Sequence, residues 1–227
     1  MDGILLVDKP EGWTSHDVVA KVRSVIKVET GQKVKVGHTG TLDPAATGLL
    51  VLVLGQYTKR AGEFSKLDKV YEAELTLGAM SSTGDREGEI SRQETGDRRL
   101  GKEEIEEVLK SFIGEIEQTP PAFSAIKVDG QRAYKLARAG KEVDIKPRKT
   151  TVYSLLSTYY RYPKLCITAR VSSGTYIRSL AEDIGEKLET GAYLSALRRT
   201  QIGKYSLSNG LALENLKFDN IIKHLAN

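Results

Sequence analysis

The sequence predicts an α+β fold with a largely antiparallel sheet, because strand-like and helix-like segments interleave irregularly along its 227 residues. Apolar residues occupy every second position of 71–77 and of 165–171, which is the period of a half-buried strand. Apolar residues at helical spacing in 18–26 and 177–188 indicate helices instead. Strands with one wetter face favour antiparallel pairing, since purely parallel sheets are covered on both faces.

The first sixty residues set out a strand, a helix, a loop and a second strand. Gly3 to Val7 predicts a short strand, and Ser15 is expected to cap the helix that carries the apolar residues of 18–26. Residues 36–48, VGHTGTLDPAATG, hold three glycines and a proline and predict a loop. The continuous apolar run Leu49 to Leu54 predicts a strand buried on both faces.

Three more elements are expected further along. One helix presents Ile105, Val108, Leu109 and Phe112 on one face, with Gly114 placed to end it. A second helix starts at about Thr175, and the 211–226 tail resembles a helix. No repeat of 20–50 residues is visible, so one large domain or two merged subdomains suit the chain best.

Composition excludes several classes of protein. Hydrophobic residues make up 40% and charged residues 28%, which is typical of a packed globular chain rather than a disordered one. No apolar run approaches the roughly 18 residues of a membrane helix. The start of the chain resembles neither a signal peptide nor a transit peptide. We therefore expect a cytoplasmic protein.

The sequence offers little support for metal or cofactor chemistry. Cys166 is the only cysteine and the three histidines are irregularly spaced, so neither a disulfide nor a zinc site is expected. Phosphate-loop, dinucleotide-binding and nucleophile-elbow signatures are absent from the sequence. We expect no cofactor and no metal, and any catalysis would use ordinary side chains.

Charge is distributed unevenly. Residues 81–117 carry eleven Asp and Glu against six Lys and Arg, whereas residues 127–149 carry eight basic residues against three acidic ones. The basic stretch also contains Tyr134 and is punctuated by glycine and proline. Such a segment suits contact with a nucleic-acid backbone, and an ordinary solvated basic surface is the alternative.

Asp43 lies in the glycine-rich loop and has two interpretations. Asp followed by Pro44 is a favoured start for a helix, with Asp as the N-cap and Pro at the first helical position. Alternatively, Pro44 biases Asp43 to an extended conformation while the neighbouring glycines let a substrate approach the backbone closely. Local sequence does not choose between the two.

Several motifs occur in a fixed order along the chain. They are Leu5–Ser15 (LLVDKPEGWTS), Gly37–Leu50 (GHTGTLDPAATGLL), Lys69–Tyr71 (KVY) and Ser173–Leu180 (SGTYIRSL), the last trailed by Leu197–Thr200 (LRRT). Together they resemble the TruB family of tRNA pseudouridine-55 synthases. Between them, Pro120–Lys127 (PPAFSAIK) opens a stretch similar to the RNA-gripping insertion of that family. The resemblance covers roughly residues 3–205.

The resemblance implies a fold and an activity. The fold is the pseudouridine synthase fold, a central and largely antiparallel mixed sheet flanked by helices with an active-site cleft across the sheet. The activity is isomerisation of uridine-55 in the T-loop of tRNA to pseudouridine. The glycosidic bond breaks, the base turns and C1′ rejoins at C5, with the carboxylate of Asp43 as catalyst.

The resemblance also implies roles for residues around the target uridine. Arg178 would pair with Asp43, Tyr71 would stack on the uracil, Tyr176 and Leu197 would hold the base, and His38 would hold the T-loop. Each residue has a plainer alternative. Arg178 could be an exposed surface arginine, Tyr71 and Leu197 could pack in a core, and His38 could be structural.

RNA contacts are expected along the basic segment and at one residue near the N-terminus. The expected residues are Lys9, Lys127, Arg132, Tyr134, Lys135, Arg138, Lys141 and Arg148. The expected partner is the T-stem-loop of tRNA, with no membrane, and the protein is expected to be a monomer. A non-catalytic RNA-binding or chaperone protein, or a nucleotide-directed hydrolase, are the alternatives.

The domain organisation follows from the same resemblance. We expect residues 1–227 to form a pseudouridine synthase catalytic domain, with the RNA-gripping insertion at about 120–150. A C-terminal domain of the PUA type, which many members of the family carry, is not expected within this sequence.

Overall fold

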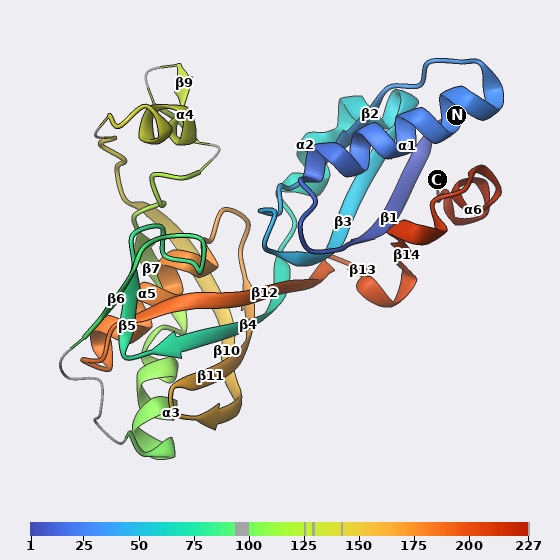
Figure 1. Ribbon diagram of the computed structural model, residues 1–227. Coiled ribbons are helices and arrows are strands. Elements are labelled where there is room, and N and C mark those ends of the chain that lie inside the picture. Colours follow the sequence, from blue (N-terminus) through green and yellow to red (C-terminus); the bar gives the residue numbers. More distant parts are fainter. Residues whose placement is uncertain (94–99, 125, 129, 142, 227) are drawn as a thin grey trace. The chain divides into compact units, whose positions relative to one another are not determined.

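The protein is described from a computed structural model that covers residues 1–93, 100–124, 126–128, 130–141 and 143–226 (Figure 1). These residues form two compact units. The first unit consists of Met1–Glu72 and Leu197–Asn227, and the second of Ala73–Ala196. Strands β4 (Lys69–Leu77) and β12 (Ala192–Ile202) each begin in one unit and end in the other.

The remaining elements fall within one unit or the other. Those of the first unit are β1 (Gly3–Lys9), α1 (Ser15–Thr30), β2 (Val36–His38), β3 (Thr47–Leu54), η1 (Gly55–Arg60), α2 (Ala61–Ser65), β13 (Tyr205–Ser206), η2 (Leu207–Asn209), β14 (Leu211–Ala212), η3 (Leu213–Asn215) and α6 (Phe218–His224). Those of the second unit are β5 (Ala79–Ser81), β6 (Ile90–Arg92), α3 (Lys102–Ser111), β7 (Gly114–Gln118), β8 (Lys127–Val128), β9 (Gln131–Arg132), α4 (Ala133–Arg138), β10 (Arg148–Arg161), β11 (Lys164–Val171) and α5 (Ile177–Lys187).

The first unit is a mixed sheet with apolar packing on both faces. Strand β3 pairs antiparallel with β1 along one edge, and with β2 and the parallel β12 along the other. Strand β1 also pairs in parallel with β14. Of the pairs in this sheet whose orientation is given for the described residues, β1–β14 and β3–β12 are parallel, whereas β1–β3, β2–β3, β12–β13, β10–β11 and β7–β10 are antiparallel. This confirms the predicted fold class, an α+β protein with a largely antiparallel sheet.

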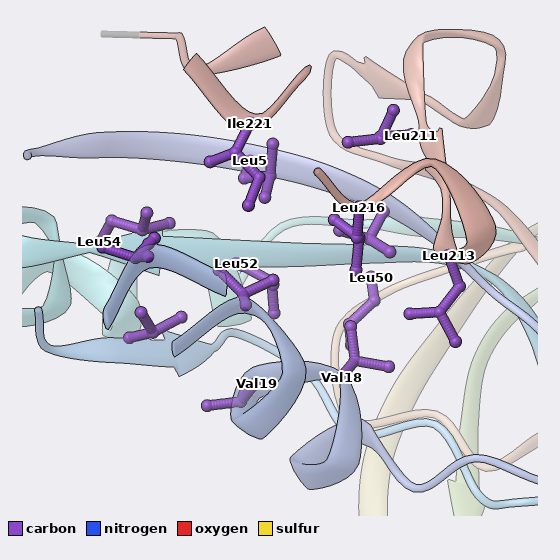
Figure 2. Packing of buried hydrophobic residues seen from close by; sticks show 14 residues of the cluster. Leu5, Val18, Val19, Leu50, Leu52, Leu54, Leu211, Leu213, Leu216 and Ile221 are labelled. Carbon is purple, nitrogen blue, oxygen red and sulfur yellow. The ribbon is translucent and has the colours of Figure 1, made fainter. Parts of the chain in front are cut away.

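Strand β3 is buried on both faces, as its continuous apolar sequence predicts. Leu50, Leu52 and Leu54 pack with the apolar residues of α1 and of the C-terminal segment on one face (Figure 2). Leu49 and Val53 pack on the other face, in the cluster that includes Phe64 of α2. The strand therefore forms the centre of the first unit.

The capping residue of α1 is Thr14, so the prediction of Ser15 is wrong by one position. The Thr14 hydroxyl accepts a hydrogen bond from the Asp17 amide at 3.0 Å, and the Asp17 carboxylate accepts one from the Thr14 amide at 2.9 Å. This reciprocal capping box satisfies two amides at the helix N-terminus. Ser15 is thereby the first helical residue, and its buried side chain is available for a contact elsewhere.

Two further expectations need correction. Part of the predicted 36–48 loop is strand β2, which aligns His38 with Leu52 of β3. The 211–226 tail is a short strand, a 3₁₀ turn and only then the helix α6, because Leu211 and Ala212 pair with β1 before the chain turns. Pairing with a neighbouring strand is a tertiary effect that local propensity does not contain.

The second unit is a sheet in the order β12, β4, β11, β10, β7 with helices packed on it. The alternating residues of β4 and β11 bury Leu75, Leu165 and Ile167, as predicted. Helix α3 packs against β10 and ends at Ser111, with Phe112 as its C-cap. Gly114 is the first residue of β7 and not the residue that ends the helix, which corrects that prediction. The predicted helices at about 105–112 and from about 175 are both confirmed.

Among the described residues, none of the helices combines the length and the apolar character that crossing a membrane requires.

We predict that Gly185→Ala destabilises the protein by about 3 kcal/mol, because a methyl group there overpacks the junction of α5 and β12. Its Cβ would lie 2.2 Å from the Ala192 nitrogen and 2.5 Å from the Ala192 Cβ. The matched control is Gly62→Ala in α2, where a Cβ meets no atom within 4 Å. We expect the control to be neutral or stabilising by about 0.5–1 kcal/mol. Urea denaturation curves measure both, and equal midpoints for Gly185→Ala and the parent would contradict the packing.

Candidate active site

Asp43 lies in a tight turn that leads directly into β3. The Ala46 amide donates to the Asp43 carbonyl at 3.1 Å, and Pro44 occupies the second position of the turn, where its fixed φ is favoured. No helix follows Asp43 in this part of the described chain, so the helix-capping interpretation is wrong. The Asp43 side chain is partly buried.

Helix α1 holds the main chain immediately before Asp43. The Ser15 hydroxyl donates to the Leu42 carbonyl at 3.1 Å and accepts from the Leu42 amide at 2.8 Å. One buried hydroxyl thus satisfies both main-chain groups of the preceding residue. Its position at the start of α1 depends on the Thr14 cap, which links the capping box to the placement of Asp43.

Lys9 holds the main chain immediately after Asp43. Its side chain is 0% exposed, and the ammonium group donates to the carbonyls of Pro10, Trp13 and Pro44 at 2.9, 2.7 and 3.3 Å. An ammonium group has three donors, so these three bonds use all of them. The expectation that Lys9 grips an RNA phosphate does not fit this burial, and its observed contacts make it a support of the loop.

Arg199 on β12 is a second buried cation beneath the loop. Its guanidinium donates to the carbonyls of Gly40 at 2.9 Å and Leu49 at 2.8 Å, which lie before and after the turn. The loop that carries Asp43 is therefore fixed through its backbone by side chains from β1, α1 and β12. The position of the Asp43 main chain is thereby defined.

Burial and nearby charge shift the pKa values of several groups in the first unit. Burial lowers the pKa of Lys9 to about 8, although the Asp43 carboxylate opposes this shift. Burial also lowers the pKa of Lys69 to about 8, with the Arg199 charge adding to the effect. The pKa of His38 is lowered by burial first, and then by Arg199 and His16. The charge of Arg199 thus helps to lower the pKa values of both Lys69 and His38.

The other expected substrate residues of the first unit lie on strands. Tyr71 on β4 is 8% exposed, and Leu197 is on β12 and only partly buried. The Leu197 carbonyl accepts from the Thr47 hydroxyl at 3.4 Å, which ties it to the end of the Asp43 loop. His38 ends β2, and its Nδ1 is a buried atom without a hydrogen-bond partner in the described residues.

Arg178 in the second unit is buried, so the alternative of an exposed surface arginine is wrong. Its guanidinium is 3.3 Å from the Asp85 carboxylate, and it donates to the carbonyls of Thr83 and Phe123 at 3.3 and 2.9 Å. The Arg178 and Asp85 side chains are 8% and 12% exposed. A buried ion pair with two further hydrogen bonds fixes the guanidinium in one geometry.

Tyr176 sits at the start of α5 and is held by a side chain from β7. The Gln118 side chain accepts from the Tyr176 amide at 2.8 Å and donates to the Tyr176 carbonyl at 3.0 Å. The Ser179 hydroxyl donates to the Thr119 carbonyl at 2.9 Å. These contacts fix Gln118 and Thr119, which precede the basic region in the chain, to the start of α5.

The basic region contains the β8–β9 hairpin, α4 and the start of β10. All six expected cations in this region are exposed, and Tyr134 is partly buried with the Arg138 guanidinium 5.8 Å from its ring centre. Those cations are Lys127, Arg132, Lys135, Arg138, Lys141 and Arg148. Lys149, by contrast, is paired with Glu115 at 2.7 Å.

Three residues hold the site together without being evident from the sequence, namely Ser15 as an anchor of the loop, Arg199 and Asp85. Arg199 lies two residues after Leu197 in the LRRT motif, but the motif alone does not tell which arginine is buried. Asp85 follows a Ser-Ser-Thr-Gly run that reads only as a turn. Their partners lie far away in sequence, which local patterns do not reveal.

Family models match almost the whole chain. Residues 23–177 match the model described as TruB family pseudouridylate synthase (N terminal domain). Residues 178–223 match the model described as tRNA pseudouridylate synthase B C-terminal domain.

Curated relatives and solved structures agree with these matches. The tRNA pseudouridine synthase B of Clostridium kluyveri is 46% identical over 225 residues, which are 99% of this chain and 75% of that protein. The protein of the same name from Aquifex aeolicus is 46% identical over 94% of this chain and 73% of its own. A Cbf5-Nop10-Gar1 complex matches with a TM-score of 0.69 and 29% identity, over 93% of this chain and 52% of that one. An H/ACA RNP bound to a substrate RNA containing 2′-deoxyuridine matches with a TM-score of 0.68 and 27% identity, over 93% and 51%.

We predict that the partly buried ring of His38 makes the protein less stable in acid. Because its folded pKa lies below the ordinary 6.5, the unfolded chain takes up a proton more readily once the pH falls below about 6.5. The contribution of His38 to stability is therefore present above that pH and is lost as the pH falls toward the folded pKa. In His38→Gln, the free energy of unfolding should fall less between pH 7.5 and pH 5 than in the parent. Identical losses in urea titrations at the two pH values would exclude this role.

Proposed function

Because the chain belongs to the TruB family of pseudouridylate synthases, we propose that it isomerises uridine-55 in the T-loop of tRNA to pseudouridine, with Asp43 as the catalytic carboxylate. The observation that carries the proposal is the immobilised turn around Asp43. Ser15, Lys9 and Arg199 all bond to the backbone on either side of it. The main chain that carries the carboxylate is thereby held in one position.

The reaction suits an enzyme that works with side chains alone. The N1–C1′ bond of uridine breaks, the uracil turns, and C5 bonds to C1′. The proton on C5 is then released and N1 takes up a proton. The atoms of the nucleoside are conserved and no electrons are transferred to another molecule. A carboxylate can serve either as a nucleophile toward the sugar that later leaves again, or as a base toward a sugar proton.

The residues around the target uridine are assigned as the family resemblance suggests. Tyr71 would lie against the uracil, where an aromatic face replaces base stacking worth about 1–3 kcal/mol. Tyr176 and Leu197 would hold the base, and His38 would hold the T-loop. The pairing of Arg178 with the Asp43 carboxylate stays a prediction from the sequence.

The RNA would be gripped mainly by the basic region. A base inside a helix hides the atoms that react, so the uridine has to be turned out of the stack at a cost of a few kcal/mol. Contacts between exposed Lys and Arg and the phosphates can offset that cost. The proposal draws support from one structural neighbour, which is described as bound to a substrate RNA.

We predict that Asp43→Asn abolishes the isomerisation of an unmodified tRNA transcript. Tritium at C5 of the uracil is released when the new carbon–carbon bond forms, so release measures turnover. The rate should fall at least ~100-fold, the smallest loss expected when a general base is removed. Asp219→Asn in the first turn of α6 is the matched control and should retain the parent rate. Comparable release from the parent and from Asp43→Asn would remove Asp43 from the mechanism.

The same assay separates the proposed function from its two rivals. An RNA chaperone would bind the transcript and release no tritium. A hydrolase would release free uracil and so lower the mass of the RNA. An isomerase leaves the RNA mass unchanged. Mapping the modified nucleotide then tests the assignment to position 55.

We predict that tRNA binding weakens steeply with salt, because phosphate contacts displace counterions. Replacing one exposed cation of the basic region, for example Lys135→Gln or Lys141→Gln, should lower the slope of log Kd against log salt by about 1 if that residue contacts a phosphate. Lys223→Gln, an exposed cation of α6, is the control and should keep the parent slope. An affinity that does not change between low and moderate salt would argue against this interface.

A further inference from the structure

Arg199 has no role in the proposed chemistry, yet it is among the largest fully buried side chains of the protein, with 1% exposure. A guanidinium carries five N–H donors and a permanent charge, so its removal from water is costly unless the donors are bonded. In the described structure, each of its three nitrogens donates to a main-chain carbonyl. Such bonds stabilise the conformation of the main-chain segments that supply the carbonyls.

All of these carbonyls belong to the two ends of the Asp43 loop. Nε donates to the Leu49 carbonyl at 2.8 Å, Nη2 to Gly40 at 2.9 Å and Nη1 to Thr41 at 3.5 Å. One planar group therefore joins the chain as it enters the loop to the chain as it leaves. Thr41 is only two residues before Asp43.

The backbone of Arg199 is as close to the loop as its side chain. Arg199 is aligned with Gly48 in the parallel pairing of β12 with β3. A Cβ on Gly48 would lie 2.3 Å from the Arg199 carbonyl oxygen, and Gly48 has a φ of +100°, which disfavours other residues. The start of β3 and Arg199 are thus packed with no space for adjustment.

A lysine could not reproduce this contact. The guanidinium offers its donors in a fixed plane, whereas an ammonium group is a point charge on a flexible stem. A misplacement of about 1 Å at a catalytic group can cost roughly 10²-fold in rate. The planar arrangement of the Arg199 donors (the guanidinium fork), and not only its charge, therefore helps to determine the position of Asp43.

We propose that Arg199 is a positioning residue for catalysis: by bonding the carbonyls of Gly40, Thr41 and Leu49, it holds the loop so that the Asp43 carboxylate meets the nucleoside. This inference rests on the proposed function of Asp43. It assigns Arg199 no contact with the substrate. Loss of the fork should therefore affect turnover much more than RNA binding.

The first test compares Arg199→Lys with the parent in the tritium-release assay and in tRNA binding. We expect kcat to fall about 10- to 100-fold while Kd for tRNA changes less than about threefold. Arg60→Lys, at an exposed ion pair on the surface, is the matched control and should change neither value. Equal kcat values for Arg199→Lys and the parent would overturn the proposal, as would a loss that lies in Kd alone.

A second measurement does not depend on activity. In Arg199→Lys, amide hydrogen exchange in residues 39–46 should accelerate at least tenfold, while the amides of β1 and the centre of β3 keep their protection. Unchanged exchange in the loop would overturn the proposal even if the protein had no activity at all. Inactivity of the parent, in contrast, would reject the proposed function and leave this readout intact.

A further variant covers the case in which Arg199→Lys does not fold. Gly40→Val keeps Arg199 but adds side-chain atoms against Nη1, which lies 3.5 Å from the position of a Cβ on residue 40. Displacing the fork in this way should give the same signature of lower kcat, little-changed Kd and faster exchange in 39–46. Parent-like kcat and exchange in Gly40→Val would contradict the proposal.

Discussion

The first unit depends on burying positive charge beneath a loop whose carbonyl groups point at it. Lys9 and Arg199 are excluded from water, and main-chain oxygens from the Asp43 loop and its neighbours replace their hydration. A loop normally keeps its polar backbone in water, since a buried carbonyl without a donor is costly. Here each partner satisfies the other, so the loop is fixed without becoming a helix or a strand.

This arrangement requires a rigid support on which the cations can be placed. Strand β3 provides it, because apolar residues cover both of its faces and its edges pair with β1, β2 and β12. The Lys9 side chain leaves from β1 and the Arg199 side chain from β12, on either side of β3. The hydrophobic core thereby determines the positions of Lys9 and Arg199. These buried cations are tolerated because main-chain carbonyls bond to them.

Most elements follow from local patterns, whereas the caps, the short strands and the anchors of the loop do not. The apolar run Leu49 to Leu54 and the alternation in β4 and β11 predict their strands correctly. The reason is that the spacing of apolar residues depends on whether one or both faces of a strand are buried. Strand β2 is not evident from the sequence, because three residues are too few to show a period. The sequence does not distinguish Thr14 from Ser15 as the cap of α1, because both residue types are good caps and only the bonds with Asp17 separate them.

The sequence by itself determined the family, the fold class and Asp43 as the candidate carboxylate, since these depend on ordered motifs and on the periodicity of apolar residues. Only the tertiary structure decided that Asp43 stands in a turn and that Ser15, Lys9 and Arg199 hold that turn. Their bonds to the loop span 27, 35 and 159 residues. A buried cation needs acceptors in three dimensions, and contacts over such separations arise only when the whole unit packs.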